Sequence, residues 1–124
     1  MNPLTREWLA KAHEDYHLVI TLLRRKKIPA NTICFHAQQA VEKYIKAILQ
    51  ERQTRFGRTH DLVALLELLS EDAGSLPLLV NDLRYLSNFA VITRYPGFNA
   101  TVKEARNAAL AMRRIRDAAI LLLK

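Results

Sequence analysis

The sequence predicts an all-α fold, an antiparallel up-and-down four-helix bundle with an additional short helix. The first observation behind this prediction is that apolar residues recur every three or four positions along most of the chain. The second is that no run of alternating β-branched residues competes with this spacing. The third is that the expected long helices are joined by short connections, which favours antiparallel packing side by side.

The first two helices have the most regular apolar patterns. The first is expected over residues 5–24, before Pro29, with an apolar face made of Leu9, Ala12, Tyr16, Val19 and Leu23. Asn31 is the predicted N-cap of the second helix, because a short amide side chain accepts hydrogen bonds from the free N–H groups of a first turn. The apolar face of this second helix carries Cys34, Ala37, Val41, Tyr44 and Ile48.

The polar side of the second helix allows two interpretations. It carries His36, Gln39, Lys43, Lys46 and Gln50. A solvated outer face explains this composition, with Glu42 and Lys46 paired one turn apart. A strip that faces a cleft or a partner subunit explains it as well, because the small residues Ala40 and Ala47 beside the strip allow another helix to approach closely.

The second half of the chain predicts a short helix and two longer ones. A basic connection over residues 51–59 leads to the short helix, expected over residues 60–70. The fourth helix is expected to start at Ser75 as N-cap, with Pro77 in its first turn, and to run to Thr93. The turn that follows contains Pro96 and Gly97.

The last helix has the clearest start signal. Thr101 and Glu104 form a predicted capping box, in which each side chain accepts a hydrogen bond from the backbone N–H of the other residue. Its core face carries Ala105, Ala108, Met112, Ile115, Ala119 and Leu122. Because no repeat, low-complexity stretch or boundary divides the chain, one helical domain over residues 1–124 is expected.

Composition narrows the class of protein and of partner. Lysine and arginine number 19 and acidic residues 12, a net charge of +7 that favours an anionic partner such as nucleic acid, a nucleotide or an acidic protein. The single cysteine excludes an internal disulfide and a cysteine-based zinc site. No apolar run approaches the ~20 residues of a membrane span and no signal region follows the first Met, so a cytoplasmic protein is expected.

One short motif matches a metal-site signature. Residues 13–17 read H-E-D-Y-H, the H-E-x-x-H spacing of zinc proteases, which places His13 and His17 on one helix face. No third ligand follows on a predictable element, and a solvated helix face is the favoured interpretation. We therefore predict no metal and no cofactor.

Two kinds of basic feature could bind phosphate. Arginines and lysines cluster at residues 24–27, 52–58 and 113–116, either as solvated helix ends or as one phosphate-binding surface. Arg94 stands at the end of a helix, before a turn stiffened by Pro96. Its guanidinium either grips a phosphate with two parallel hydrogen bonds or bonds to the last carbonyls of its own helix.

Four blocks of residues together resemble the HEPN domain family, in its small stand-alone prokaryotic form. They are Trp8 with Ala12 and Asp15, F-H-A-Q-Q-A-V-E-K at residues 35–43 with Lys46 and Ala47, T-H-D-L at residues 59–62, and R-Y-P-G at residues 94–97. The blocks follow the order of the family and cover roughly residues 6–122. The resemblance implies a helical bundle that pairs into a homodimer, with a functional cleft at the dimer interface.

Members of this family include metal-independent ribonucleases, toxins encoded beside a minimal nucleotidyltransferase, and relatives that only bind RNA or nucleotides. Active members carry an arginine and, after a gap of four to six residues, a histidine. Arg94 matches the arginine, but Asn99 stands where the histidine would, and no histidine follows His60. Asparagine forms hydrogen bonds without exchanging a proton near neutral pH. His36 or His60 would replace the missing base only if the fold brings one of them near Arg94.

The resulting functional expectation is a HEPN-type RNA- or nucleotide-binding module, a homodimer that acts with a minimal nucleotidyltransferase in a toxin–antitoxin-like pair. Arg94 would grip phosphate, Tyr95 and Asn99 would shape the pocket, and Lys43 and Lys46 would add charge. The alternative is a metal-independent ribonuclease that uses Arg94 and an unorthodox base; whether the chain is an enzyme stays open. A scaffold for an acidic protein partner is the third reading, and Tyr95 is a candidate acceptor of a transferred AMP group.

Overall fold

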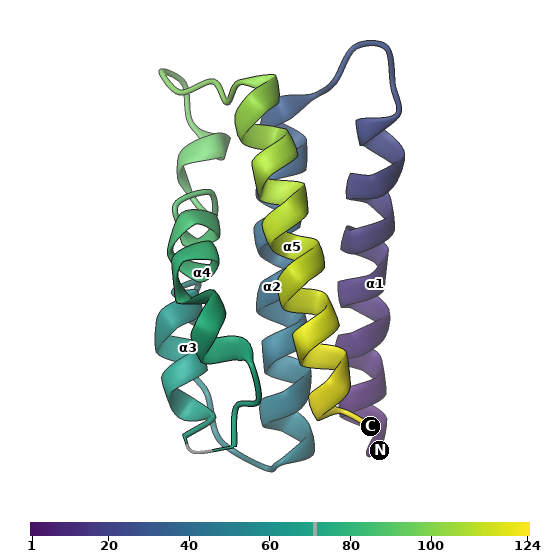
Figure 1. Ribbon diagram of the computed structural model, residues 1–124, viewed down its shortest axis with the longest axis vertical. Coiled ribbons are helices and arrows are strands. Elements are labelled where there is room, and N and C mark those ends of the chain that lie inside the picture. The colour runs from purple at the N-terminus through teal and green to yellow at the C-terminus, as the bar shows by residue number, and fades with distance from the viewer. Residues whose placement is uncertain (71) are drawn as a thin grey trace.

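A computed structural model describes residues 1–70 and 72–124 and confirms the all-α prediction. Its five α-helices are joined by turns, two of them short 3-10 helices, and no strand occurs among these residues. Three helices are long: α1 (Pro3–Leu23), α2 (Ala30–Glu51) and α5 (Val102–Leu122). The long helices run side by side, and the two termini lie at the same end of the molecule (Figure 1).

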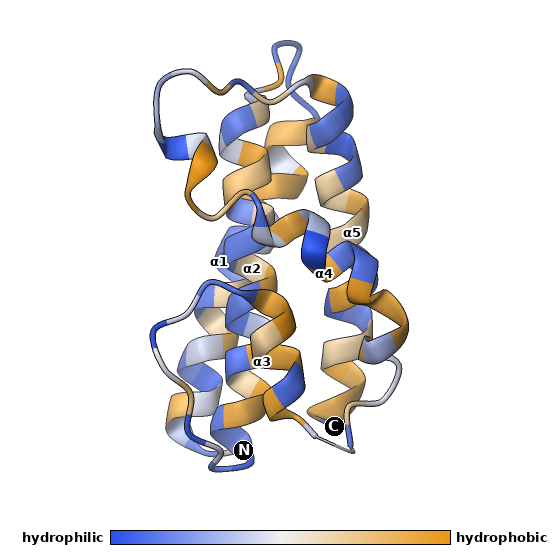
Figure 2. Ribbon diagram, turned by 90° about the vertical axis from the view of Figure 1, so that its left-hand side faces the viewer, coloured by the Kyte–Doolittle hydropathy of each residue, from blue (hydrophilic) through white to orange (hydrophobic). Residues whose placement is uncertain are grey.

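Helix α2 forms the centre of the molecule. It packs against α1 on one side and against α3 (Leu62–Leu68) and α4 (Val80–Ser87) on the other, with α5 across its front (Figure 1). Of its 22 residues, 13 are buried, too many for a helix with one solvated half. The hydrophobic parts of the helices face the interior between them (Figure 2). Of the two interpretations of its polar side, the solvated outer face therefore does not fit this helix, in which Glu42 and Lys46 are buried.

The starts of the first two helices differ from their predictions. Asn2 caps α1, because its side-chain oxygen accepts from the backbone N–H of Thr5 at 2.8 Å, so this helix begins two residues earlier than expected. Asn31 does not cap α2, which follows Pro29 with no side-chain cap. Its side-chain oxygen instead accepts from the backbone N–H of Ala100 at 2.7 Å. The amide thus ties the start of α2 to the segment before α5.

The expected fourth helix is interrupted. A 3-10 turn (η1, Leu76–Leu79) precedes α4, and a second one (η2, Ile92–Arg94) follows it, so the continuous helix predicted to Thr93 is wrong. Ser87, the last residue of α4, uses its hydroxyl to donate to the carbonyl of Leu83 and to accept from the backbone N–H of Leu62. Hydroxyl groups that bond to nearby backbone in this way compete with the helical pattern.

The starts of α3 and α5 depend on side-chain caps. Asp61 caps α3 by accepting from the backbone N–H groups of Val63 and Ala64. The predicted capping box of α5 is confirmed, since Thr101 and Glu104 exchange side-chain-to-backbone hydrogen bonds of 3.0 Å. Among the described helices, none combines the length and the hydropathy that crossing a membrane requires.

Candidate nucleic-acid interface

Arg94 ends the short helix η2 and lies on the surface, beside the N-terminal half of α2. Its guanidinium carbon is 5.2 Å from the centre of the Phe35 ring, within the range of a cation–π contact. Among residues 1–70 and 72–124, no carboxylate pairs with Arg94 and no carbonyl accepts from its guanidinium. The side chain is therefore positioned by an aromatic ring while its N–H groups stay free for an anion.

The turn after Arg94 displays an aromatic ring. Tyr95 has an extended backbone (φ −117°, ψ 149°), as expected for a residue that precedes proline, and its side chain is 62% exposed. Gly97 has a φ of +96°, a conformation that side-chain-bearing residues rarely adopt. Pro96 and Gly97 together fix the turn, so Arg94 and Tyr95 are presented next to each other at the surface.

Asn99, which the family resemblance aligns with the histidine of active members, is hydrogen-bonded to α2. Its side-chain oxygen accepts from the amide of Asn31 at 3.2 Å. Asn31 and Phe35 lie four residues apart on α2, so they are neighbours on one helix face. Arg94 and Asn99 therefore meet the same face of α2, one helical turn apart.

A buried carboxylate organises the neighbouring part of α2. Asp15 of α1 is 8% exposed, and its two oxygens contact His36 Nδ1 at 2.8 Å and Lys43 Nζ at 2.6 Å. Because a carboxylate only accepts, Nδ1 of His36 carries the proton and Nε2 remains available. The His36 ring meets the Phe35 ring edge to face, with centroids 5.2 Å apart. The fold thus places His36, and not His60, next to the ring that holds Arg94.

Lys46 has a different environment from the one expected for a ligand-binding lysine. Its side chain is buried, 3.0 Å from a carboxylate oxygen of Glu42, and its ammonium lies 5.6 Å from the ring centre of Trp8 and 5.7 Å from that of Phe56. The ammonium is consequently enclosed by two aromatic rings and an acid. Lys43 keeps a partly exposed side chain, although Asp15 holds its charge.

Glu42 connects this enclosed lysine to the segment before α3. Burial by itself raises the pKa of the Glu42 carboxyl, but hydrogen bonds from His60, Gln38 and Lys46 outweigh burial and hold the pKa below its ordinary value. The contact to His60 Nδ1 is 2.7 Å long. His60 therefore acts as an anchor that ties its own segment to α2.

The two histidines of the zinc-protease signature have no completed metal site around them. His13 Nδ1 is 2.7 Å from the Tyr44 hydroxyl, so one ring nitrogen is already engaged. Burial, followed by the charges of Arg116 and His17, lowers the pKa of His13. In the part of the chain that the structure describes, no three histidine, cysteine or acidic side chains are grouped as metal ligands require.

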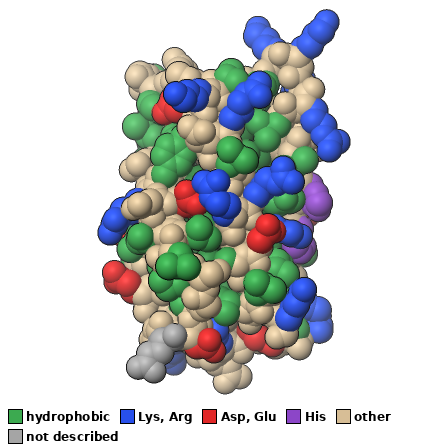
Figure 3. Space-filling model, in the orientation of Figure 1, with side chains coloured by type: hydrophobic (Ala, Val, Ile, Leu, Met, Phe, Trp, Pro, Cys, Tyr) green, Lys and Arg blue, Asp and Glu red, His purple; other side chains and the backbone are tan. Residues whose placement is uncertain are grey.

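The basic runs do not form one surface. Residues 24–27 lie at one end of the long axis, whereas the connection over residues 51–59 begins at the other end, where α2 ends (Figure 1). On α5, Arg114 pairs with Asp82 at 2.8 Å, whereas Arg113 is exposed. Over the α5 face, lysine and arginine side chains alternate with hydrophobic and acidic ones (Figure 3). Within one chain, the best organised candidate for anion binding is the Arg94 site, made of Arg94, Tyr95, Asn99, Phe35 and His36.

Phe35 acquires a role that the sequence pattern left undefined, and His36 is the one of the two candidate substitute bases that lies beside Phe35. The sequence did contain a signal that the carboxylate of Asp15 has partners in the fold. Asp15 falls on the apolar stripe of the first helix, three residues after Ala12 and four before Val19. A carboxylate on a buried stripe requires cationic or hydrogen-bonding partners, and His36 and Lys43 are spaced by two turns on the helix that packs there.

Comparisons with known proteins agree with this fold. The family model of the HEPN domain matches residues 5–122 of this chain. The crystal structure of TT1696 from Thermus thermophilus superposes with a TM-score of 0.84 and 27% identity, covering 98% of this chain and 99% of that one. The crystal structure of ST0689, an archaeal HEPN homologue, has a TM-score of 0.75 and 20% identity over the whole of both chains, a likeness of fold. No curated protein matches the sequence.

Proposed function

The chain belongs to the HEPN domain family, and from this premise we propose that it is an RNA- or nucleotide-binding module whose Arg94 grips a phosphate of the ligand. The observation that carries the proposal is the exposed guanidinium of Arg94, stacked on Phe35 and free of any acidic partner in the described chain. An arginine oriented in this way loses little side-chain freedom when it binds. Its planar N–H fork matches a phosphate.

The neighbouring groups suit the same kind of ligand. Tyr95 offers an exposed ring on which a base stacks. His36 adds a ring nitrogen, and Lys43 adds positive charge at the edge of the site. Asn99 donates through the amide nitrogen that its contact with Asn31 leaves unused. Lys46 is left out of the contacting set because its ammonium is enclosed.

We further propose that the module acts as a homodimer, with a minimal nucleotidyltransferase as its partner protein in the cytoplasm. The family resemblance supports both the second copy of the chain and the nucleotidyltransferase partner. For the homodimer there is additional support in the apolar side chain of Ile92 beside Arg94, which is 42% exposed. A second copy that covers this side chain would bring two Arg94 sites together. Tyr95, with its exposed hydroxyl, is the proposed acceptor if the partner transfers AMP.

The test uses end-labelled RNA incubated with the purified protein in EDTA and resolved on a native and a denaturing gel. Wild type should shift intact RNA, and Arg94→Ala should not. Arg113→Ala is the matched control, because it removes another exposed arginine, from α5. An absence of any shift at low salt, or an equal loss in both variants, would contradict the proposal.

A metal-independent ribonuclease is the second candidate function, favoured by the Asp15–His36 pair. His36 Nε2 would take the proton of the ribose 2′-hydroxyl, whose oxygen attacks the adjacent phosphorus. The 5′-oxygen would leave with a proton from water, giving a 2′,3′-cyclic phosphate and a 5′-hydroxyl end. Cleavage on the denaturing gel that His36→Asn abolishes would support this function. Intact RNA with wild type would exclude it.

A further inference from the structure

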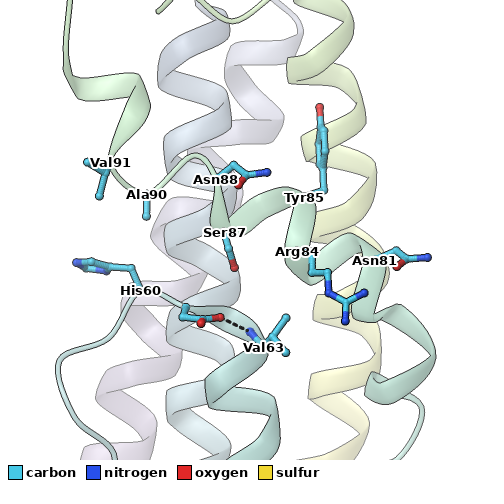
Figure 4. Close-up of a pocket in the computed structure, with 10 residues that line it drawn as sticks. His60, Val63, Asn81, Arg84, Tyr85, Ser87, Asn88, Ala90 and Val91 are labelled. Carbon is cyan, nitrogen blue, oxygen red and sulfur yellow. Dashed lines mark hydrogen bonds between the residues drawn. The ribbon is translucent and has the colours of Figure 1, made fainter.

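A groove of about 670 Å³ opens between the start of α3 and the length of α4. It is lined by His60 and Asp61 before α3, by side chains of α4, and by Ala90 and Val91 beyond α4 (Figure 4). Its polar lining includes His60, Asn81, Arg84 and Asn88. None of these residues belongs to the Arg94 site, so the groove is a separate feature of the surface.

A short stretch of backbone, from Val91 to Arg94, connects the groove with the Arg94 site. The carbonyl of Val91, at one end of the groove, accepts from the backbone N–H of Arg94 at 3.0 Å. The segment after α4 continues along the long axis, above α4 (Figure 1). Arg84 lies on α4, whereas Arg94 ends η2, ten residues later and beyond the turn that follows α4. The two arginines therefore belong to separate elements.

The charges in the groove suit an anion. Arg84 is exposed, and within residues 1–70 and 72–124 it takes part in no ion pair. His60 uses Nδ1 for Glu42, which leaves Nε2 free on a half-exposed ring. The one carboxylate among the residues that line the groove, that of Asp61, accepts from the backbone N–H groups of Val63 and Ala64 through one oxygen, which holds it at the start of α3.

We infer that this groove binds the continuation of a single-stranded RNA held at Arg94, with Arg84 contacting a second phosphate. This inference rests on the proposed function and makes it more specific. The ligand is then a strand of several nucleotides and not a mononucleotide. The amides of Asn81 and Asn88 supply donors and acceptors for sugar and base edges, and the half-buried Tyr85 and exposed Val91 form the apolar part of the groove.

The experiment compares the affinities of AMP, a dinucleotide, a tetranucleotide and an octanucleotide for wild type, Arg84→Gln, Arg94→Gln and Arg113→Gln. Fluorescence anisotropy or competition at several salt concentrations provides the dissociation constants. Arg84→Gln should leave AMP affinity unchanged and weaken the octanucleotide about tenfold, since a hydrogen-bonded charge contact is lost. The salt slope for the octanucleotide should also become shallower by about 0.7, one phosphate contact of a single strand.

The outcomes separate the inference from the function on which it rests. Binding of the octanucleotide that depends on Arg94 but is the same in Arg84→Gln as in wild type would overturn the groove and leave the proposed function standing. An equal loss in Arg84→Gln and Arg113→Gln would also overturn it, because net charge would then explain the effect. Absence of binding to any probe would overturn both. Circular dichroism confirms that each variant is folded.

Discussion

The guanidinium carbon of Arg94 lies 5.2 Å from the ring centre of Phe35, although the two residues are far apart in the sequence. This contact joins the only arginine of the R-Y-P-G turn to the central helix. The ring of His36, which meets the Phe35 ring edge to face, is in turn held by Asp15. A chain of contacts therefore runs from a buried carboxylate of α1 to an exposed cation on η2, and each link of it can be altered separately.

The ring of Phe35 is expected to matter for ligand binding more than for stability. Phe35→Leu removes the cation–π contact, worth about 0.5–1 kcal/mol at an exposed site, so RNA affinity should fall about two- to fivefold. Anisotropy titration measures this change. Phe56→Leu is the control, because Phe56 contacts Lys46 and lies outside the Arg94 site. A variant of Phe35 that binds as well as wild type would show that the ring does not orient Arg94.

Loss of the Asp15 carboxylate should destabilise the protein. Asp15→Asn leaves His36 and Lys43 without their acidic partner, and both side chains are partly exposed. Breaking a fully buried pair costs about 3–5 kcal/mol, and rehydration of the exposed partners reduces the expected cost to about 1–3 kcal/mol. Urea unfolding measures it. Glu14→Gln, on the exposed side of the same helix, should have no measurable effect.

The parts of the fold that depend on local patterns were predictable from the sequence. The capping box of Thr101 and Glu104 involves residues three apart, and the buried face of α2 follows the spacing of apolar residues. The parts that depend on distant partners were not. Asn31 bonds to Ala100, 69 residues away, instead of capping its helix. Ser87 ends α4 while it bonds to Leu62, 25 residues earlier.

The features of the candidate site also divide into those that local patterns predict and those that depend on distant partners. Pro96 and Gly97 made an exposed, fixed turn at Arg94 predictable. The burial of Lys46 was not predictable from α2 alone, because Trp8 and Phe56, the rings that enclose it, come from α1 and from the segment before α3. The placement of Arg94 on the Phe35 ring, beside His36, likewise depends on how η2 packs on α2, which no local pattern specifies.

Stability should decrease in acid through Glu42. The pKa of this carboxyl is lower in the folded protein than its ordinary value of 4.5, so the folded state favours the ionised form. The stabilisation is fully present above pH 4.5 and is lost as the pH falls through the folded pKa.

Urea unfolding of wild type between pH 7 and about pH 3 should show this decrease in stability. Glu42→Gln should be less stable at pH 7 and should lose less stability in acid, whereas Glu67→Gln, an exposed control, should follow wild type. Parallel curves for wild type and Glu42→Gln would contradict the assignment.

Restoring the family's histidine tests whether the rest of the catalytic arrangement is intact. Asn99→His places an imidazole on the same side of α2 as Arg94, and a group that titrates near neutrality becomes available for proton transfer. If the wild-type protein binds RNA without cleaving it, this variant should cleave RNA in EDTA, with a gain of about 10²–10⁴ over background from general acid–base catalysis. The exchange removes the hydrogen bond to Asn31, which should lower stability by about 1 kcal/mol, so thermal unfolding is measured first.

Adding Arg94→Ala to Asn99→His should abolish the gained activity, because the phosphate is then no longer held. RNA that stays intact with a folded Asn99→His variant would show that more than the histidine separates this chain from the active members of its family.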